Sequence, residues 1–216
     1  MVMSKILETL RQEMFVAIMR GIPTDKIGEV AKASVAGGVK FVEITYDQKK
    51  EDPKAYFKEQ IEAVKAAVGD TAYLGAGTVL TVDQVNWAVE NGAQYIVSPN
   101  TNDDVIRRTK ELGLVSVPGA MSPSEIVHAY DLGADIVKLY IIEDPQYVKF
   151  LQGPLGHIPY QATCNVSLET IPQWLKAGAK CFGTRAFITN DLIENCDYEE
   201  ITRRAAAHVK AIRDNA

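Results

Sequence analysis

The chain has 216 residues, of which 47% are hydrophobic and 24% are charged, as is typical of a globular protein. This composition excludes a disordered, collagen-like or coiled-coil chain, and the length predicts a single domain over residues 1–216. Lysine and arginine total 23 against 28 acidic residues, which gives a net charge of −5 without a basic cluster. The charge therefore argues against nucleic acid as a partner.

The cysteines and the N-terminal segment indicate the compartment of the protein. Cys164, Cys181 and Cys196 form no CxxC pair, disulfide framework or four-ligand zinc pattern, which favours a reducing compartment. Residues 1–14 have the spacing of a short amphipathic helix and lack the apolar core of a signal peptide. No segment reaches the roughly 20 apolar residues needed to span a bilayer. We expect a cytoplasmic protein without membrane contact.

Helical stretches that end at glycine and run directly into β-rich segments recur along the chain. Glycine supplies the left-handed residue after a helix end, so each junction predicts a turn from helix to strand. In chain order we expect a helix at 3–13, a last helix at about 197–213, further helices between the strands, and eight strands at 14–20, 40–46, 72–78, 95–99, 115–119, 136–141, 158–163 and 181–187.

Eight consecutive strand–helix units are the number that closes a parallel barrel. The sequence therefore predicts the α/β class, with a (β/α)8 TIM barrel and an extra N-terminal helix. The alternative is an open doubly wound sheet, but the turn at residues 20–24 lacks the GxGxxG pattern of a dinucleotide site. Helix start signals lie where the barrel needs them, at residues 24–25, 81–84, 102–104, 122–125 and 167–170.

Two charged residues fall inside predicted strands, where parallel strands covered on both faces are normally apolar. The two-residue period places Glu43 and Thr45 on one face of the second strand, and Lys138 and Tyr140 on one face of the sixth. Because the alternate positions are aliphatic and suit the helix-facing side, the charged residues are expected to point into the barrel. Both lie in the C-terminal half of their strands, where barrel active sites are found.

Two interpretations of these buried charges stand side by side. In the first, Glu43 and Lys138 form a structural ion pair that fills the barrel. In the second, a neutral Lys138 amine attacks a ketone to form a Schiff base, and Glu43 transfers protons as general acid and base.

Polar residues also follow other predicted strands. Thr78 ends a GxGT segment that on its own more often indicates close packing, and Thr163 ends the seventh strand. Residues 164–167 and 183–185 lie where barrels commonly bind phosphate, although an ordinary solvated turn explains residues 183–185 equally well. The three histidines lie in unrelated predicted elements, so neither a metal nor a cofactor is expected: His128, His157 and His208.

Together these residues resemble the family of 2-keto-3-deoxy-6-phosphogluconate (KDPG) and 4-hydroxy-2-oxoglutarate (KHG) aldolases. The resemblance implies a trimeric class I enzyme on a (β/α)8 barrel. It implies the Schiff-base lysine at Lys138, the general acid/base at Glu43, and hydroxyls for the pyruvate carboxylate at Thr78 and Thr163. The matching segments run over nearly the whole chain: residues 17–20, 37–39, 43–45, 75–79, 98–99 and 118–119, with Lys138 and Thr163.

Three positions depart from the family pattern. Asp47 stands where an arginine is usual, Cys164-Asn165 replaces a Gly-Gly pair, and Arg185 stands where an aromatic residue is common. A carboxylate at position 47 repels anions and side chains at 164 and 165 obstruct phosphate, so we expect the same chemistry on a different aldehyde half. The expected substrate-binding residues are Arg20, Thr45, Thr78, Pro99, Tyr140, Thr163, Asn165, Gly183, Thr184 and Arg185.

The leading interpretation is the cleavage of a 4-hydroxy-2-oxo acid to pyruvate and an aldehyde. Two alternatives stay open. One is another barrel enzyme that acts on a phosphorylated small molecule and uses Lys138 as a cation. The other is a non-catalytic paralogue that binds a small phosphorylated or keto-acid ligand. The identity and stereochemistry of the aldehyde half are also open at this point.

Overall fold

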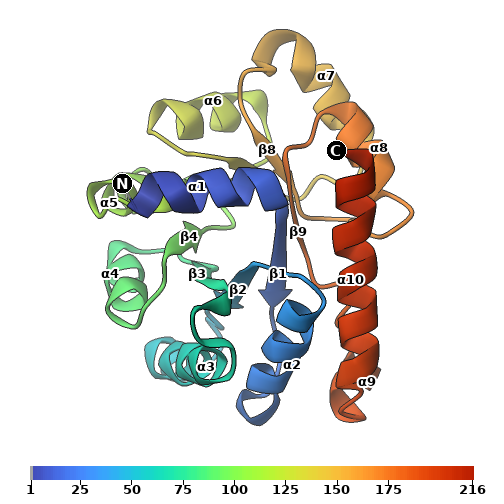
Figure 1. The fold of residues 1–216 in the computed structure, drawn as a ribbon. Coiled ribbons are helices and arrows are strands. Elements are labelled where there is room, and N and C mark those ends of the chain that lie inside the picture. The colour runs from blue at the N-terminus through green and yellow to red at the C-terminus, as the bar shows by residue number, and fades with distance from the viewer. Residues whose placement is uncertain (1) are drawn as a thin grey trace.

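The computed structural model describes residues 2–216 as a parallel, barrel-like sheet with helices on its outside (Figure 1). Within these residues the sheet has nine strands in the order β5-β4-β3-β2-β1-β9-β8-β7-β6. The strands are β1 (Phe15–Met19), β2 (Phe41–Thr45), β3 (Tyr73–Gly77), β4 (Tyr95–Val97), β5 (Val115–Val117), β6 (Gly119–Ala120), β7 (Val137–Leu139), β8 (Tyr160–Ala162) and β9 (Cys181–Thr184). The α/β class is confirmed, and every predicted strand region contains a strand.

The two ends of the strand order, β5 and β6, are neighbours in the chain. Only Pro118 separates them, while β5 pairs with β4 and β6 pairs with β7. The sheet therefore closes on itself through a covalent connection. The sequence predicts one strand at 115–119, and the break falls at the proline because it has no N–H to donate to a strand ladder. Its carbonyl still accepts a hydrogen bond from the Lys138 N–H at 2.9 Å.

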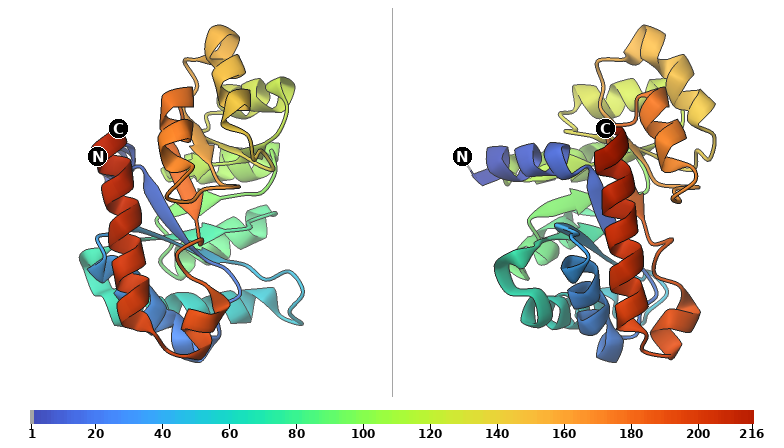
Figure 2. Two further views of the ribbon diagram at one scale, coloured as in Figure 1. Left: turned by 90° about the vertical axis from the view of Figure 1, so that its right-hand side faces the viewer. Right: turned by 45° about the vertical axis from the view of Figure 1, so that its right-hand side comes forward.

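Helices follow the strands along the chain and surround the sheet as an outer ring (Figure 1). Figure 2 shows α10 lying along α2, where Thr202 Oγ1 donates to Ala33 O at 3.0 Å. No helix in residues 2–216 has both the length and the apolar character needed to cross a membrane. The helices are α1 (Val2–Glu13), α2 (Thr24–Ala36), α3 (Pro53–Val68), α4 (Val82–Glu90), α5 (Asp103–Glu111), α6 (Pro123–Asp131), α7 (Pro145–Leu155), α8 (Ile171–Ala177), α9 (Asn190–Glu194) and α10 (Tyr198–Asn215), with a 3-10 turn η1 (Gly69–Thr71).

Helix α1 covers the N-terminal ends of the strands. Its Ile6 and Leu10 are buried in one apolar cluster with strand residues that include Phe41, Tyr95 and Val115. A second, larger cluster packs the strands against the outer helices. Apolar side chains therefore close this end of the sheet.

Capping side chains fix where several helices begin. Thr81 accepts a hydrogen bond from Gln84 N at the start of α4, and Asn102 accepts from two backbone N–H groups at the start of α5. At α6, Ser122 accepts from Glu125 N while the Glu125 carboxylate accepts from Ser122 N, which is the capping box that the sequence predicts. These hydrogen bonds hold the pKa of the Glu125 carboxyl below its usual value. Local sequence thus determines the entry into the helices that follow β3, β4 and β6.

The capping box at α6 gives a test of this local stability. Replacing Ser122 by alanine should lower the free energy of unfolding by about 1 kcal/mol, because the first turn of α6 loses an acceptor for its N–H groups. Ser124, exposed in the same turn, is the matched control: Ser124→Ala should leave stability unchanged or raise it by roughly 0.5 kcal/mol. Urea unfolding at neutral pH measures both, and equal effects of the two substitutions would contradict the capping role.

Candidate active site

Glu43 lies on β2 inside the sheet. Its side chain is 0% exposed, and neither carboxylate oxygen has a hydrogen-bond partner in the described part of the chain. Gly77 on β3 makes room for this carboxylate, because a Cβ at Gly77 would lie 2.0 Å from Glu43 Oε1. An unpaired buried carboxylate costs stability, so its retention points to chemistry rather than to packing.

Strand β7 carries Lys138 into the same interior. The side chain is 5% exposed, and the register places Lys138 beside Gly119 of β6 and Gln161 of β8. Its Nζ lies 5.6 Å from the centre of the Tyr140 ring. Across residues 2–216 no carboxylate lies within 4.0 Å of this nitrogen. Glu43 and Lys138 are thus both buried and form no ion pair, so the interpretation of a structural ion pair is wrong.

The ends of β1, β2 and β3 bring Arg20, Thr45 and Thr78 around one cavity of about 340 Å³. Arg20 Nη2 donates to Thr78 Oγ1 at 2.6 Å. The loop after β2 adds residues 46–49 to the lining, and α3 adds Tyr56 and Gln60. In this loop Asp47 Oδ1 accepts from the Lys49 N–H at 3.1 Å, so the Asp47 carboxylate is engaged within its own turn.

The loop after β8 holds two of the predicted residues. Thr163 Oγ1 donates to Gly183 O on β9 at 3.0 Å. Asn165 has a φ of +51°, and its Nδ2 donates to Glu143 O at 3.0 Å. Asparagine tolerates this left-handed conformation better than most residues. The loop therefore keeps a backbone that suits glycine, with the Asn165 amide turned onto a neighbouring carbonyl.

Arg185 follows β9 and lies close to the end of β1. Its Nη2 donates to Ile188 O at 3.2 Å and to Asn190 Oδ1 at 3.0 Å. Its Nη1 lies 3.9 Å from the position that a Cβ would take on Gly21. Burial, followed by the neighbouring charge of Arg20, lowers the pKa of Arg185. Neither guanidinium has a carboxylate partner among the described residues, so this edge of the site offers two cations to an anion.

Three further predicted residues lie outside the 340 Å³ cavity. Thr184 donates through its hydroxyl to Val166 O at 3.1 Å. Pro99 packs so closely on Gly119 that a Cβ there would lie 2.3 Å from Pro99 O. Tyr140 is 41% exposed and borders Lys138. Pro99 and Thr184 therefore hold the strand ends together, and only Tyr140 of these three approaches the buried lysine.

Tyr95 of β4 was not among the predicted residues. It is fully buried, its hydroxyl has no partner in the described chain, and burial followed by the Glu43 carboxylate raises its pKa. The ring occupies the space above Gly75, where a Cβ would lie 2.2 Å from a ring atom. A tyrosine in a strand is unremarkable, so the GxG segment of β3 is the only sequence signal for it.

A larger cavity of about 680 Å³ lies beside the C-terminal end of α1. Its lining includes Arg11 and His157. Glu43 and Lys138 line neither this cavity nor the one of about 340 Å³. We place the candidate site at the opposite end of the strands, because Thr45 there shares its strand face with Glu43. Residues 2–216 contain no group of three or more His, Cys, Asp or Glu side chains arranged to hold a metal ion.

Parallel strands, alternating helices and a buried lysine without an anionic partner define an α/β enzyme of the barrel-like class. The family model "KDPG and KHG aldolase" matches residues 6–204, and the chain belongs to this family of carbon–carbon lyases. It is 34% identical over 203 residues to the 2-dehydro-3-deoxy-6-phosphogalactonate aldolase of Escherichia coli (strain K12), covering 92% of this chain and 94% of that protein.

Two solved structures are similar over nearly the whole chain. A native structure of KDPGal has a TM-score of 0.81 and 32% identity, covering 93% of this chain and 95% of the other. A cube-shaped protein cage designed by fusing symmetric oligomeric domains has the same score and identity, covering 93% of this chain and 72% of its own. The fold is thus shared with these structures over nearly the whole chain.

The close approach of Gly77 to Glu43 gives a direct test of the site geometry. Gly77→Ala should lower the free energy of unfolding by about 1–3 kcal/mol, because the added Cβ overlaps the carboxylate. In a Glu43→Ala background the same substitution should cost at least about 1 kcal/mol less, as measured by a double-mutant cycle in urea. Gly37→Ala, which meets Ala205 and Thr202 of α10 instead, is the control and should cost the same in both backgrounds. An equal cost of Gly77→Ala in both would contradict the placement of Glu43.

Proposed function

We propose that the protein is a class I aldolase that cleaves a 4-hydroxy-2-oxo acid to pyruvate and an aldehyde, with Lys138 as the Schiff-base residue. The observation that carries this proposal is a lysine 5% exposed that has no anionic partner and shares its interior with an unpaired buried glutamate. A lysine amine that is not engaged in an ion pair is available to add to a ketone as a nucleophile. Membership of an aldolase family supports the same chemistry.

In the proposed cleavage, the Lys138 amine adds to the C2 ketone and water leaves, which forms an iminium. Glu43 then accepts the proton of the C4 hydroxyl while the C3–C4 bond breaks, and the electron pair of that bond moves to the iminium to give an enamine. The aldehyde departs, Glu43 returns a proton to the enamine carbon, and water hydrolyses the new iminium to release pyruvate and the free lysine. The iminium serves as electron sink, so the reaction draws on no metal or other cofactor.

Thr78 and Thr163 are proposed to bind the pyruvate carboxylate. Thr78 Oγ1 accepts from Arg20, so its own hydrogen remains to be donated to a carboxylate. Thr163 Oγ1 donates to Gly183 O, so its hydrogen would have to turn toward the substrate. Thr78 is therefore the stronger of the two candidates.

The aldehyde half is proposed to lie toward the two arginines and the cavity at the ends of β1 to β3. Arg20 and Arg185 favour an anionic or hydroxylated substituent, and Asp47 opposes a highly charged one. The other predicted binding residues, namely Thr45, Pro99, Tyr140, Asn165, Gly183 and Thr184, border this path or support it. Because Asn165 keeps a glycine-like backbone, the alternative of a non-catalytic paralogue has no specific observation in its favour.

We propose that β5 and β6 together act as one strand, so that residues 1–216 form a single (β/α)8 domain with α1 as an additional helix. Assembly as a homotrimer is also proposed, through the exposed apolar side chains of Met121, Tyr140, Ile141 and Phe150. Ile141 and Phe150 are 57% and 72% exposed, which is unusual for such residues in a monomer. Three free cysteines support a reducing, cytoplasmic location.

Borohydride trapping tests the proposed function. Incubation with pyruvate and borohydride should add one reduced pyruvyl group per chain, which peptide mapping should locate on Lys138, and activity should be lost. Glu43→Gln should still form the adduct but exchange the pyruvate methyl protons about a hundredfold more slowly, because the base is absent. Labelling confined to Lys110 or Lys176, or unchanged proton exchange in Glu43→Gln, would contradict the assigned roles.

A substrate panel tests the aldehyde half. We expect a lower kcat/KM for 2-keto-3-deoxy-6-phosphogluconate than for at least one unphosphorylated or differently substituted 4-hydroxy-2-oxo acid, because Asp47 repels a dianion. Arg185→Ala should weaken every anionic substrate by roughly tenfold. If the phosphorylated sugar acid is the best substrate and Arg185→Ala abolishes that preference, then Arg185 compensates for Asp47 and the expected shift is wrong.

A further inference from the structure

The turn after β3 holds Thr78 in a conformation that a β-branched residue rarely adopts. Its φ is +58°, in the left-handed region. Such a conformation persists only where the surroundings determine it. Thr78 is held at two points: its hydroxyl accepts from Arg20 Nη2 at 2.6 Å, and its carbonyl oxygen accepts from Gln48 Nε2 at 2.9 Å. The second contact comes from the loop after β2.

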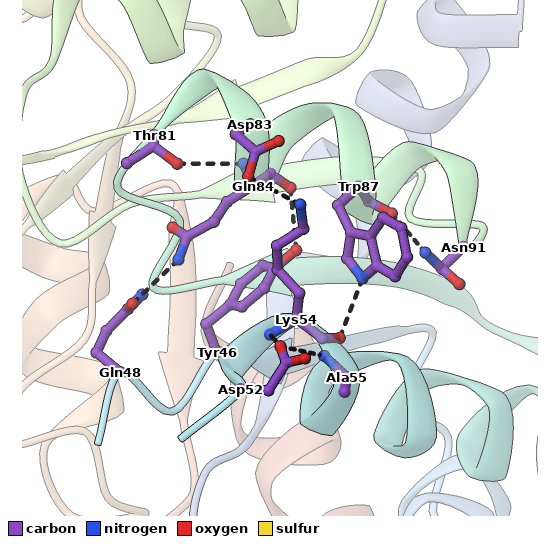
Figure 3. Close-up of polar contacts among 10 residues, drawn as sticks. All are labelled: Tyr46, Gln48, Asp52, Lys54, Ala55, Thr81, Asp83, Gln84, Trp87 and Asn91. Carbon is purple, nitrogen blue, oxygen red and sulfur yellow. Dashed lines mark hydrogen bonds and ion pairs between the residues drawn. The ribbon is translucent and has the colours of Figure 1, made fainter. Parts of the chain in front are cut away.

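The amide of Gln48 is fixed at both of its ends. While Nε2 donates to Thr78 O, Oε1 accepts from Gln84 Nε2 at 3.0 Å. Figure 3 shows the two side chains reaching toward each other from the loop after β2 and from the start of α4. Gln84 Oε1 in turn accepts from the Leu80 N–H at 2.8 Å. The two amides therefore bracket the turn at residues 78–80, and the donor end of Gln48 faces Thr78.

Gln84 is itself held in place by several contacts. It is buried, its N–H donates to Thr81 Oγ1 at 3.2 Å, and its carbonyl accepts from the Tyr46 hydroxyl at 3.0 Å (Figure 3). Tyr46 is itself fully buried and stacks on Phe57 with 4.3 Å between the ring centres. Gln48, by contrast, is exposed and lies in a loop. The fold thus depends little on Gln48, whereas the conformation of Thr78 depends on it.

We propose that Gln48 is a positioning residue, which aims the Thr78 hydroxyl at the substrate carboxylate by holding the Thr78 carbonyl. This proposal rests on the proposed function, in which Thr78 binds pyruvate. Because Arg20 donates to Thr78 Oγ1, the direction in which the hydroxyl donates is set by the backbone that Gln48 fixes. Gln48, Arg20 and Thr78 also line the same cavity of about 340 Å³. Without the Gln48 bond the turn relaxes and pyruvate binds more weakly, while Lys138 and Glu43 stay in place.

The test compares Gln48→Met, Gln48→Glu and the wild type. Met has similar length and makes neither hydrogen bond, and Glu keeps the oxygen that accepts from Gln84 but has no donor for Thr78. Glu51→Met, an exposed position in the same loop outside the cavity, is the matched control. The readouts are the pyruvate concentration that half-saturates borohydride trapping at Lys138, the KM and kcat of cleavage, and the melting temperature.

Both Gln48 variants should raise the half-saturating pyruvate concentration and KM by about tenfold, with kcat within roughly threefold of wild type and an unchanged melting temperature. Glu51→Met should match the wild type in every readout. An effect in Gln48→Glu alone would mean charge repulsion and overturn the proposal. So would wild-type half-saturation in both variants, or a fall in kcat together with the melting temperature. A wild-type protein that forms no adduct would instead overturn the proposed function.

Discussion

The burial of one carboxylate without a partner governs the arrangement of this site. Water would solvate Glu43 far better than the interior does, so the chain has to hold the carboxylate there by shape alone. Gly77 supplies that shape, since any side chain at this position would occupy the space of Oε1. Gly75 does the same for Tyr95, whose ring lines the interior near the carboxylate. The two glycines of β3 thus leave the space that the Glu43 carboxylate and the Tyr95 ring occupy.

Lys138 lies in the same interior, and it forms no ion pair with Glu43 in the described part of the chain. In an ion pair, Glu43 and Lys138 would each serve as the counter-charge of the other, and neither would be available for a reaction. The described chain keeps them apart, with Lys138 on β7 and Glu43 on β2, four steps away in the strand order. In the proposed function, the ketone of the substrate lies at Lys138 and its hydroxyl at Glu43. The separation of Glu43 and Lys138 is therefore as important to the proposed function as their residue types.

Much of this architecture follows from local rules that are visible in the sequence. Two-residue periodicity predicts the inward direction of Glu43 and Lys138, and the capping box at Ser122 and Glu125 predicts the start of α6. The break at Pro118 and the short helix α9 were not predicted, because strand pairing and tertiary packing decide them. The contact of Gln48 with the turn at Thr78 joins two loops that are 30 residues apart, and no local pattern encodes such a contact. The absence of an ion pair is likewise a matter of three-dimensional separation.

The seal that α1 forms over the N-terminal ends of the strands has a consequence for the order of events. With Ile6 and Leu10 packed over that end, the proposed cleavage relies on the opposite end of the strands as the route for ligands. In a passage with one opening, the last molecule to enter is the first to leave. In the proposed cleavage the aldehyde lies nearer the opening and pyruvate is bonded at depth, so release is sequential. In the reverse direction pyruvate has to be loaded first, and an aldehyde that arrives early blocks the route.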